Sequence, residues 1–155
     1  MSDPINPNHY KQSPSGVECI TITPPNYAEI LKVFKQAARP GIVFAYAPNI
    51  YNPDGRPLPP DIVAHEKVHL SRQAEMGVEK WWGWYLEDED FRYREELLAH
   101  RAEYRFLIAN CANRNTRRMA LKHVARKLAS SVYGNILSRD AAMKALTEEG
   151  DPHEL

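Results

Sequence analysis

Alternation of apolar and polar residues predicts strands only in the first third of the chain. Residues 17–23, VECITIT, alternate and are rich in β-branched side chains, which is typical of a strand. Residues 41–47, GIVFAYA, predict a second strand, and residues 49–53, NIYNP, predict a third. Asp54 and Gly55 follow as a strong turn signal, so this region is expected to form a hairpin or a strand with a long return loop.

Helical spacing of apolar residues replaces this alternation in the rest of the chain. An early helix is expected over residues 26–38, with Asn26 as its N-cap. Another opens at residues 59–61, Pro-Pro-Asp, because proline is tolerated in a first turn and an acidic residue suits the positive end. It should end near Gly77 and be followed by an aromatic and acidic connection over residues 78–90.

Three more helices are predicted after this connection. They cover residues 91–111, 114–133 and 138–149, and Ser138 is the expected N-cap of the last. Because strands come first and helices later, the fold class is α+β. We expect a short antiparallel or mixed sheet packed on the helix that starts at residue 60, followed by a helical C-terminal half.

The length of 155 residues suits one compact domain with its own core. We expect that domain to cover residues 17–149, with flexible tails at residues 1–16 and 150–155. The formal net charge is zero, so neither nucleic acid nor a membrane is expected as a partner. No apolar run approaches the roughly 18 residues of a membrane span, and the N-terminus lacks the pattern of a signal peptide. Cys19 and Cys111 show no metal-binding spacing and are expected to be reduced, buried thiols.

The strongest chemical signal is the run His65-Glu66-Lys67-Val68-His69, which matches the pattern HExxH. Residues four apart share one face of a helix, so His65 and His69 can direct ring nitrogens at one ion. Glu66 lies about 100° further around the helix, where its carboxylate can take a proton from a zinc-bound water. The pattern therefore predicts a zinc site with Glu66 as general base, against the plainer alternative of an exposed helix face with chance spacing.

Two histidines do not complete a catalytic zinc site, which usually has three protein ligands and one open position. The extension HxxGxxH is absent after His69, so a third histidine at that spacing is excluded. The helix predicted over residues 91–111 offers Glu95, Glu96, His100 and Glu103, and only one of them need reach the ion.

The segment HEKVH followed by EELLAHRAEY resembles the gluzincins, zinc metallopeptidases whose ligands are two histidines and one glutamate. In that group the glutamate often lies in a pattern E-x-x-A or E-x-x-x-D on the helix after the HExxH helix. The run Glu96-Leu97-Leu98-Ala99 fits the first form. The resemblance therefore implies Glu96 as the third ligand, with Glu103 as the fallback.

Two further resemblances indicate a bacteriophage origin. IYNPDGRPLPPDIVAHEKVHLSRQ is similar to small phage-encoded zincin-like proteins, in which an IYNP-type strand precedes HExxHxxRQ, and the resemblance covers about residues 41–110. Residues 6–20, NPNHYKQSPSGVECI, resemble the opening of a phage domain associated with nucleotide kinase activity. No glycine-rich phosphate loop of the Walker type exists in the chain, so kinase chemistry is not expected.

These patterns together predict a minimal zincin that hydrolyses peptide bonds. An extended peptide or protein substrate would pair with the edge of the sheet that residues 41–47 form. The host cytoplasm is the expected compartment, with the virion as the alternative, and the oligomeric state is not indicated. Two other functions stay open: a non-catalytic phage structural or interaction protein that retains a zinc site, and a zinc amidase that acts on a non-peptide or cell-wall amide.

Several other residues near the motif are candidates for supporting roles. His100 would stabilise a developing oxyanion or support a ligand, and Tyr133 and Tyr93 are further oxyanion candidates, although each also suits a structural position. The residues Arg72 and Gln73 would brace the site or be solvated.

Two groups of residues outside the motif stand out by composition. The tryptophans at 81, 82 and 84 are expected to anchor the connection against the core. A basic stripe without acidic partners runs through the helix predicted over residues 114–133, and a solvated face or a contact with phosphate or an acidic protein would explain it. The stripe consists of Arg114, Arg118, Lys122 and Arg126, with Arg117 and Lys127 beside them.

Overall fold

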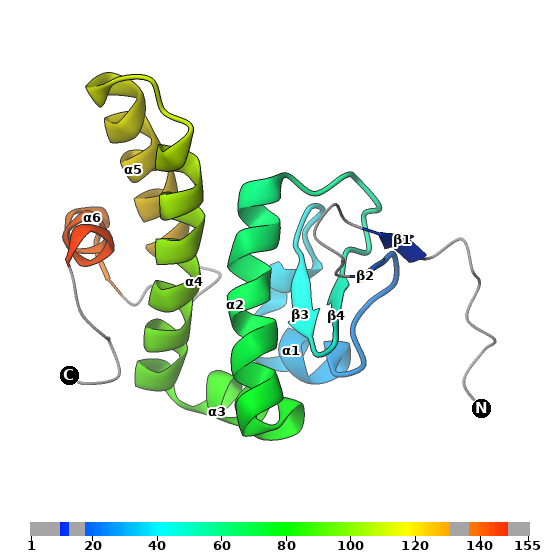
Figure 1. The fold of residues 1–155 in the computed structure, drawn as a ribbon. Coiled ribbons are helices and arrows are strands. Elements are labelled where there is room, and N and C mark those ends of the chain that lie inside the picture. Colours follow the sequence, from blue (N-terminus) through cyan, green and yellow to red (C-terminus); the bar gives the residue numbers. More distant parts are fainter. Residues whose placement is uncertain (1–9, 13–17, 131–136, 149–155) are drawn as a thin grey trace.

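The computed structural model describes residues 10–12, 18–130 and 137–148 (Figure 1). The strands are β1 (Tyr10–Gln12), β2 (Glu18–Ile20), β3 (Phe44–Tyr46) and β4 (Asn49–Tyr51). The first helical elements are α1 (Tyr27–Val33), the 3-10 turn η2 (Lys35–Ala38) and α2 (Pro60–Met76). They are followed by α3 (Val78–Glu87), α4 (Glu89–Ala109), α5 (Arg114–Leu128) and α6 (Arg139–Thr147).

The four strands form one mixed sheet in the order β1-β2-β4-β3. β2 pairs parallel to β4, whereas the other two pairings are antiparallel. β3 and β4 form a hairpin in which Tyr46 lies opposite Asn49, so the turn consists of residues 47 and 48. The signal at Asp54 and Gly55 marks a separate turn after β4, where the Gly55 amide donates to Asn52 and the Gly55 φ is 71°.

The elements are arranged in layers, with α2 between the sheet and α4 (Figure 1). β3 packs against α2 on one side, and α4 runs beside α2 on the other. α5 and α6 cover the far side of α4 (Figure 1). The interface between α2 and α4 is therefore the centre of the molecule, and side chains from both helices that point into it are withdrawn from water.

Two main hydrophobic clusters lie on either side of this interface. The first joins the sheet, α1, α3 and the start of α4, and it is rich in aromatic rings, among them Trp81, Tyr85 and Phe91. The second joins α4, α5 and α6 around Leu97, Val124 and residues of α6. A third, smaller cluster ties β2 and β4 to α2. Because burial of apolar surface is the dominant favourable term in folding, these clusters fix α2 and α4 firmly enough to hold a polar site between them.

The predicted class and architecture are confirmed: the fold is α+β, with a mixed sheet, a central helix and a helical C-terminal half. The expected connection over residues 78–90 is wrong, because α3 occupies most of it. Tyr85 follows Trp81 by four residues and Trp82 by three, so one helix face buries all three rings. Trp84 is on the other face and is 47% exposed, so two of the three tryptophans anchor the segment as expected.

Other boundaries differ from the prediction where packing overrides local pattern. The segment expected as one helix over residues 26–38 breaks at Phe34, which adopts extended backbone angles and packs its ring edge-on against Tyr85. Residues 10–12, expected within an irregular tail, form β1 because β2 offers them a pairing edge. Asn26 precedes α1 without a side-chain cap, whereas Ser138 caps α6 by accepting from the Ala141 amide, as predicted.

The remaining expectations concern the cysteines and membrane insertion. Both cysteines are free thiols, Cys19 buried and Cys111 half-buried. Among the helices described, none has the length and apolar character needed to cross a membrane.

Candidate metal centre

α2 places the two histidines of the motif on one face. The helix starts at Pro60, carries Asp61 in its first turn, and ends at Gly77, whose φ of 97° is a conformation that glycine adopts without strain. Within it His65 and His69 are four residues apart, and both are buried. Their Nε2 atoms lie 3.2 Å from each other. The sequence spacing has therefore produced the convergence that one ion requires.

α4 supplies a carboxylate to the same point. Glu96 is buried, and its Oε1 lies 3.1 Å from His69 Nε2 while its Oε2 lies 3.5 Å from His65 Nε2. Ligands at about 2.0–2.1 Å from a tetrahedral zinc ion are about 3.4 Å from one another. The two nitrogens and the carboxylate of Glu96 are separated by just such distances, so these residues fit a metal ion with two His and one Glu as ligands.

The first hydrophobic cluster, which is rich in aromatic rings, holds Glu96 in place through Tyr85. The Tyr85 hydroxyl donates to Glu96 Oε1 over 2.6 Å, and the Tyr85 ring stacks on Trp81 at 4.8 Å between centroids. Among the residues described, Glu96 Oε2 is buried without a hydrogen-bond partner. A buried carboxylate oxygen in that state costs free energy that a cation would recover, which supports a ligand role for Glu96.

Glu103 lies on the opposite side of His65 and acts on a different nitrogen. Glu103 Oε1 lies 3.2 Å from His65 Nδ1 and 3.5 Å from His100 Nδ1, while its Oε2 accepts from Lys127 Nζ over 2.8 Å. A metal-ligating histidine typically directs its other ring nitrogen at a carboxylate, which fixes the ring orientation. The geometry thus separates the two glutamates left open by the sequence: Glu96 lies beside the two Nε2 atoms, and Glu103 lies beside His65 Nδ1.

A second group with metal-ligand spacing consists of His65, His100 and Glu103. It shares His65 with the first group, and its carboxylate is already neutralised by Lys127. The first group has no ammonium among its described contacts and keeps both imidazole Nε2 atoms directed at one point. The first group is therefore the better candidate for an ion.

The charges around His65 favour a cation at this point. Burial alone lowers the pKa of His65, but the adjacent carboxylates of Glu103, Glu96 and Glu66 outweigh it and raise that pKa to about 10. Three buried carboxylates thus stabilise positive charge here, whether a proton or a metal ion carries it. Burial and the charge of His65 together lower the pKa of His100 to about 4, so His100 is neutral at physiological pH.

The three carboxylates differ in their own environments. Burial raises the pKa of Glu96 and of Glu103, yet the histidines beside each of them, and Lys127 in the case of Glu103, outweigh it and hold both pKa values well below the usual range. Burial raises the pKa of Glu66, and the charges of His65 and His69 offset this only in part. Glu66 is therefore the most basic of the three carboxylates, and Glu96 and Glu103 stay ionised.

A cavity of about 360 Å³ opens onto the centre from the side of the sheet. Its polar end is formed by His65, Glu66, His69 and Glu96 together with Glu103 and Lys127. Its wall is largely apolar and comes from α1, β3 and the segment before α2, including Ile30, Phe44 and Leu58. A molecule in this cavity would contact the predicted ligands and Glu66 at the same time.

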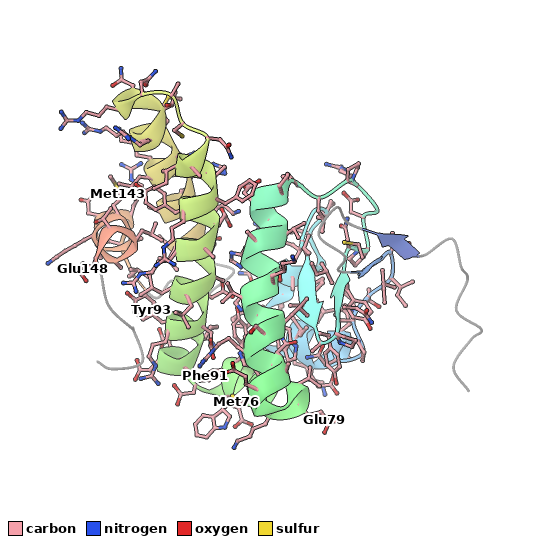
Figure 2. The ribbon with its side chains drawn as sticks, in the orientation of Figure 1. Met76, Glu79, Phe91, Tyr93, Met143 and Glu148 are labelled. Atoms are coloured by element: carbon pink, nitrogen blue, oxygen red, sulfur yellow. The ribbon has the colours of Figure 1, made fainter. Side chains whose placement is uncertain are left out.

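Two of the predicted oxyanion candidates, His100 and Tyr93, are absent from the described lining of this cavity. His100 is fully buried, its ring lies 4.4 Å from that of His65, and it is absent from the described lining, so its surroundings match the supporting role only. Tyr93 projects from α4 toward α6 (Figure 2) and packs in the second hydrophobic cluster. Tyr133 lies outside the described residues. The cations in the described lining of the cavity are Lys127 and Arg56.

Arg72 and Gln73, which follow the motif on α2, both form hydrogen bonds to neighbouring elements. These contacts agree with a bracing role rather than with solvated side chains. The side chain of Gln73 is fully buried and donates to the Ala45 carbonyl while accepting from the Ala47 amide. Trp82 Nε1 donates to the same Ala45 carbonyl. Arg72 Nε donates to the buried carboxylate of Glu95.

These contacts bear on the expected path of a substrate. β3 is an outer strand of the sheet, as the edge-pairing prediction requires. Its Ala45 carbonyl, however, already accepts two hydrogen bonds from side chains of α2 and α3. A peptide that paired with this edge would have to displace both donors, so backbone pairing at Ala45 is not favoured.

Some residues of the site carried no recognisable signal in the sequence. Tyr85 lies in the segment that the sequence predicts as a connection. Only the helical spacing of Trp81, Trp82 and Tyr85 could have placed it beside the centre. Lys127 belongs to the predicted basic stripe by sequence, but it lies on the side of α5 that carries the buried Val124 and Leu128. That position predicts contact with α4, and Glu103 is the contact made.

Comparison with models of protein families, with curated proteins and with solved structures finds no match for this chain. The resemblance to the gluzincins and to phage proteins therefore stays a prediction, and a function has to be argued from the residues themselves.

Proposed function

We propose that the chain is a zinc-dependent metallopeptidase in which Glu66 is the general base and His65, His69 and Glu96 are the metal ligands. The observation that carries this proposal is the convergence of two imidazole Nε2 atoms and one carboxylate within 3.1–3.5 Å at the end of a cavity. When bound, zinc would supply a Lewis acid that polarises a carbonyl and makes water more acidic.

The residues around the ligands have separable roles in such a reaction. Glu66 shares the cavity with the ligands without facing the same point, since its Oε1 is 4.0 Å from His65 Nε2. From there it would take a proton from the attacking water and pass it to the leaving amine. Glu103 and Tyr85 would hold His65 and Glu96 in their orientations. The apolar wall would exclude water and contact side chains of the substrate.

Zinc among the transition metals is favoured by the donor set. Two imidazoles and one carboxylate suit zinc, and the predicted open position is typical of catalytic rather than structural zinc sites. A structural site would be closed by a fourth protein ligand. Two further described groups lie near this point: His100 Nε2 is 3.5 Å from Glu96 Oε2, and Glu66 Oε1 is 4.0 Å from His65 Nε2. The cavity that opens onto the predicted ligands favours turnover over the alternative of a zinc site kept only for stability.

The test measures zinc and activity in the same preparations. Wild-type protein should contain one zinc ion per chain by elemental analysis and should cleave a mixed peptide library, read by mass spectrometry. Glu66→Gln should keep the zinc and lose about two to four orders of magnitude in rate, because it removes the base without removing a ligand. His69→Ala should lose both zinc and cleavage.

The outcomes separate the alternatives. The wild type could bind zinc and yet cleave no peptide, and Glu66→Gln could have no effect on the cleavage of cell-wall amides. This combination would indicate a metal site that only stabilises the fold. Cleavage of cell-wall amides alone, dependent on Glu66, would assign the amidase function. A wild type that binds no zinc after reconstitution would overturn the proposal altogether.

A further inference from the structure

We propose that α5 presents a binding surface for the phosphate backbone of a nucleic acid. The surface consists of Arg114, Arg117, Arg118, Lys122 and Arg126, and is called the α5 basic face below. It lies outside the metal centre, and it stands whether or not the proposed hydrolysis occurs.

The neutral total charge of the chain conceals the charge of α5. The chain contains 20 Lys and Arg residues and 20 Asp and Glu residues. Between Arg114 and Leu128, by contrast, six residues are basic and none is acidic. Association with phosphate depends on the local concentration of cations, because each neutralised phosphate releases condensed counterions. A net charge of zero therefore does not argue against a nucleic acid partner once the charges are this unevenly distributed.

The members of the α5 basic face are exposed and form no ion pair with a residue that the structure describes. All five side chains are on the solvent side of the helix. Within the described ranges, none of the five lies within ion-pair distance of a carboxylate. Lys127 on the inner side of the same helix shows the contrast, since it pairs with Glu103 at 2.8 Å. The stability of the fold thus uses one cation of α5 and leaves five available to a partner.

Three of these arginines surround a hollow. It has a volume of about 340 Å³ and lies where α5 meets α4 and α6. Arg114, Arg117 and Arg118 line it together with Tyr104, Leu121 and Met143. Figure 2 shows nitrogen-tipped side chains around the free end of α5, with Met143 on α6 directed toward the same region. The hollow offers a concave surface with guanidinium groups above apolar and aromatic atoms, which suits a sugar or a base next to a bound phosphate.

The spacing of the cations favours a nucleic acid over an acidic protein or a membrane. From Arg114 to Arg126 the helix rises by about 18 Å, at about 1.5 Å per residue. One strand of a duplex presents roughly five phosphates over that distance, and Arg114, Arg118, Lys122 and Arg126, each four residues apart, form a stripe that can follow it. Four of the five are arginines, whose planar groups bind phosphate oxygens in pairs. A membrane-binding helix would need an apolar face beside the cations, and on α5 the exposed large apolar side chain described is Met119.

The experiment measures binding of the full chain to a fluorescein-labelled duplex of about 20 base pairs by anisotropy, at salt concentrations from about 50 to 200 mM. Arg114→Gln/Arg117→Gln/Arg118→Gln should weaken binding about tenfold or more and lower the slope of log K against log salt by about 2 to 3. Lys32→Gln/Lys35→Gln/Arg39→Gln removes three exposed cations from α1 and η2 and is the matched control. It should change the affinity by less than about twofold.

A second variant and two competitors complete the test. Lys122→Gln/Arg126→Gln should also lower the salt slope, by about 2, because both residues lie on the same face. All variants should melt within a few degrees of the wild type, since the replaced side chains are exposed. The proposal would be overturned if the α5 variant and the α1 control lost the same affinity for the duplex, or if the wild type did not bind the duplex at the lowest salt concentration. Displacement of the duplex by poly-glutamate, or by vesicles with anionic lipid, at equal charge would reassign the surface to an acidic protein or a membrane.

Discussion

Lys127 Nζ lies 2.8 Å from Glu103 Oε2, and the other oxygen of Glu103 lies 3.2 Å from His65 Nδ1. A single fully buried carboxylate thus connects α5 to α2, the helix that carries two of the three predicted metal ligands. The ammonium of Lys127 makes it feasible to bury Glu103 in its charged form, and the charged form is the one that orients an imidazole. α5 therefore contributes to the site although it supplies no ligand.

The first prediction concerns this ion pair. Lys127→Met should destabilise the fold by about 1–3 kcal/mol, because Glu103 then stays buried with less compensation, and the partial exposure of Lys127 keeps the loss below that of a fully buried pair. Urea unfolding followed by circular dichroism measures the change. Lys122→Met on the exposed side of the same helix is the control and should stay within about 0.5 kcal/mol of the wild type. Equal losses in both variants would mean that the contact with Glu103 contributes nothing.

The second prediction separates the two glutamates. Glu96→Gln should abolish stoichiometric zinc binding, because a ligand is lost, whereas Glu103→Gln should weaken zinc affinity by about 10–100-fold and leave a measurable site. Competition with a chromogenic chelator gives both affinities. The reverse order of effects would make Glu103 the ligand and Glu96 the supporting residue.

The third prediction is that zinc stabilises the chain. A ligand that binds only the folded state adds about 2.7 kcal/mol when its free concentration is 100 times its dissociation constant. Thermal unfolding with a chelator and with excess zinc should therefore give clearly different midpoints. In His65→Ala the two midpoints should coincide, and a zinc-dependent shift that persisted in this variant would place the ion elsewhere.

The fourth prediction concerns the attachment of α2 to the sheet. Gln73→Leu should cost about 2–4 kcal/mol, because the Ala47 amide loses the Gln73 oxygen as its acceptor and the Ala45 carbonyl loses one of two donors. Unfolding in urea measures the loss. Gln36→Leu replaces a half-buried glutamine in η2 and should change stability by less than about 1 kcal/mol. A loss for Gln73→Leu no larger than that of the control would show that the hydrogen bonds do not stabilise the fold.

The fifth prediction distinguishes the two thiols. Burial raises the pKa of Cys19, so at neutral pH this thiol should be less ionised and shielded from reagents, whereas Cys111 is half-buried at the end of α4. Alkylation of the native protein should modify Cys111 at least about tenfold faster, as read by peptide mass spectrometry. After denaturation the two rates should converge. Similar native rates would mean that β2 opens readily.

The sequence was informative where one residue pattern has one physical consequence. Two histidines four apart on a helix must share a face, so the pairing of His65 with His69 followed directly from spacing. Likewise the β-branched and alternating runs led to β2, β3 and β4, and the polar residue at 138 led to the cap of α6.

The rest depended on packing between segments distant in the chain. Whether Glu96 or Glu103 lies beside the two Nε2 atoms could not be decided from one helix, because both share a stripe of α4, and the rotation of α4 against α2 makes the choice. The sequence does not predict α3 clearly because the helix has only ten residues, and Gly83 and the exposed Trp84 interrupt the run of buried rings. The role of Lys127 required knowing that α5 lies on the outer side of α4.

The amide of Gln73 has one more consequence. The outer strand of a sheet exposes unpaired peptide groups that can recruit another chain and start aggregation. Gln73 offers β3 an N–H and a C=O at once, as the main chain of a neighbouring strand would, and it bonds to residues 45 and 47 with both. A side chain thereby imitates an additional strand, and self-association through this margin of the sheet is suppressed at the place where a foreign strand would otherwise begin to add.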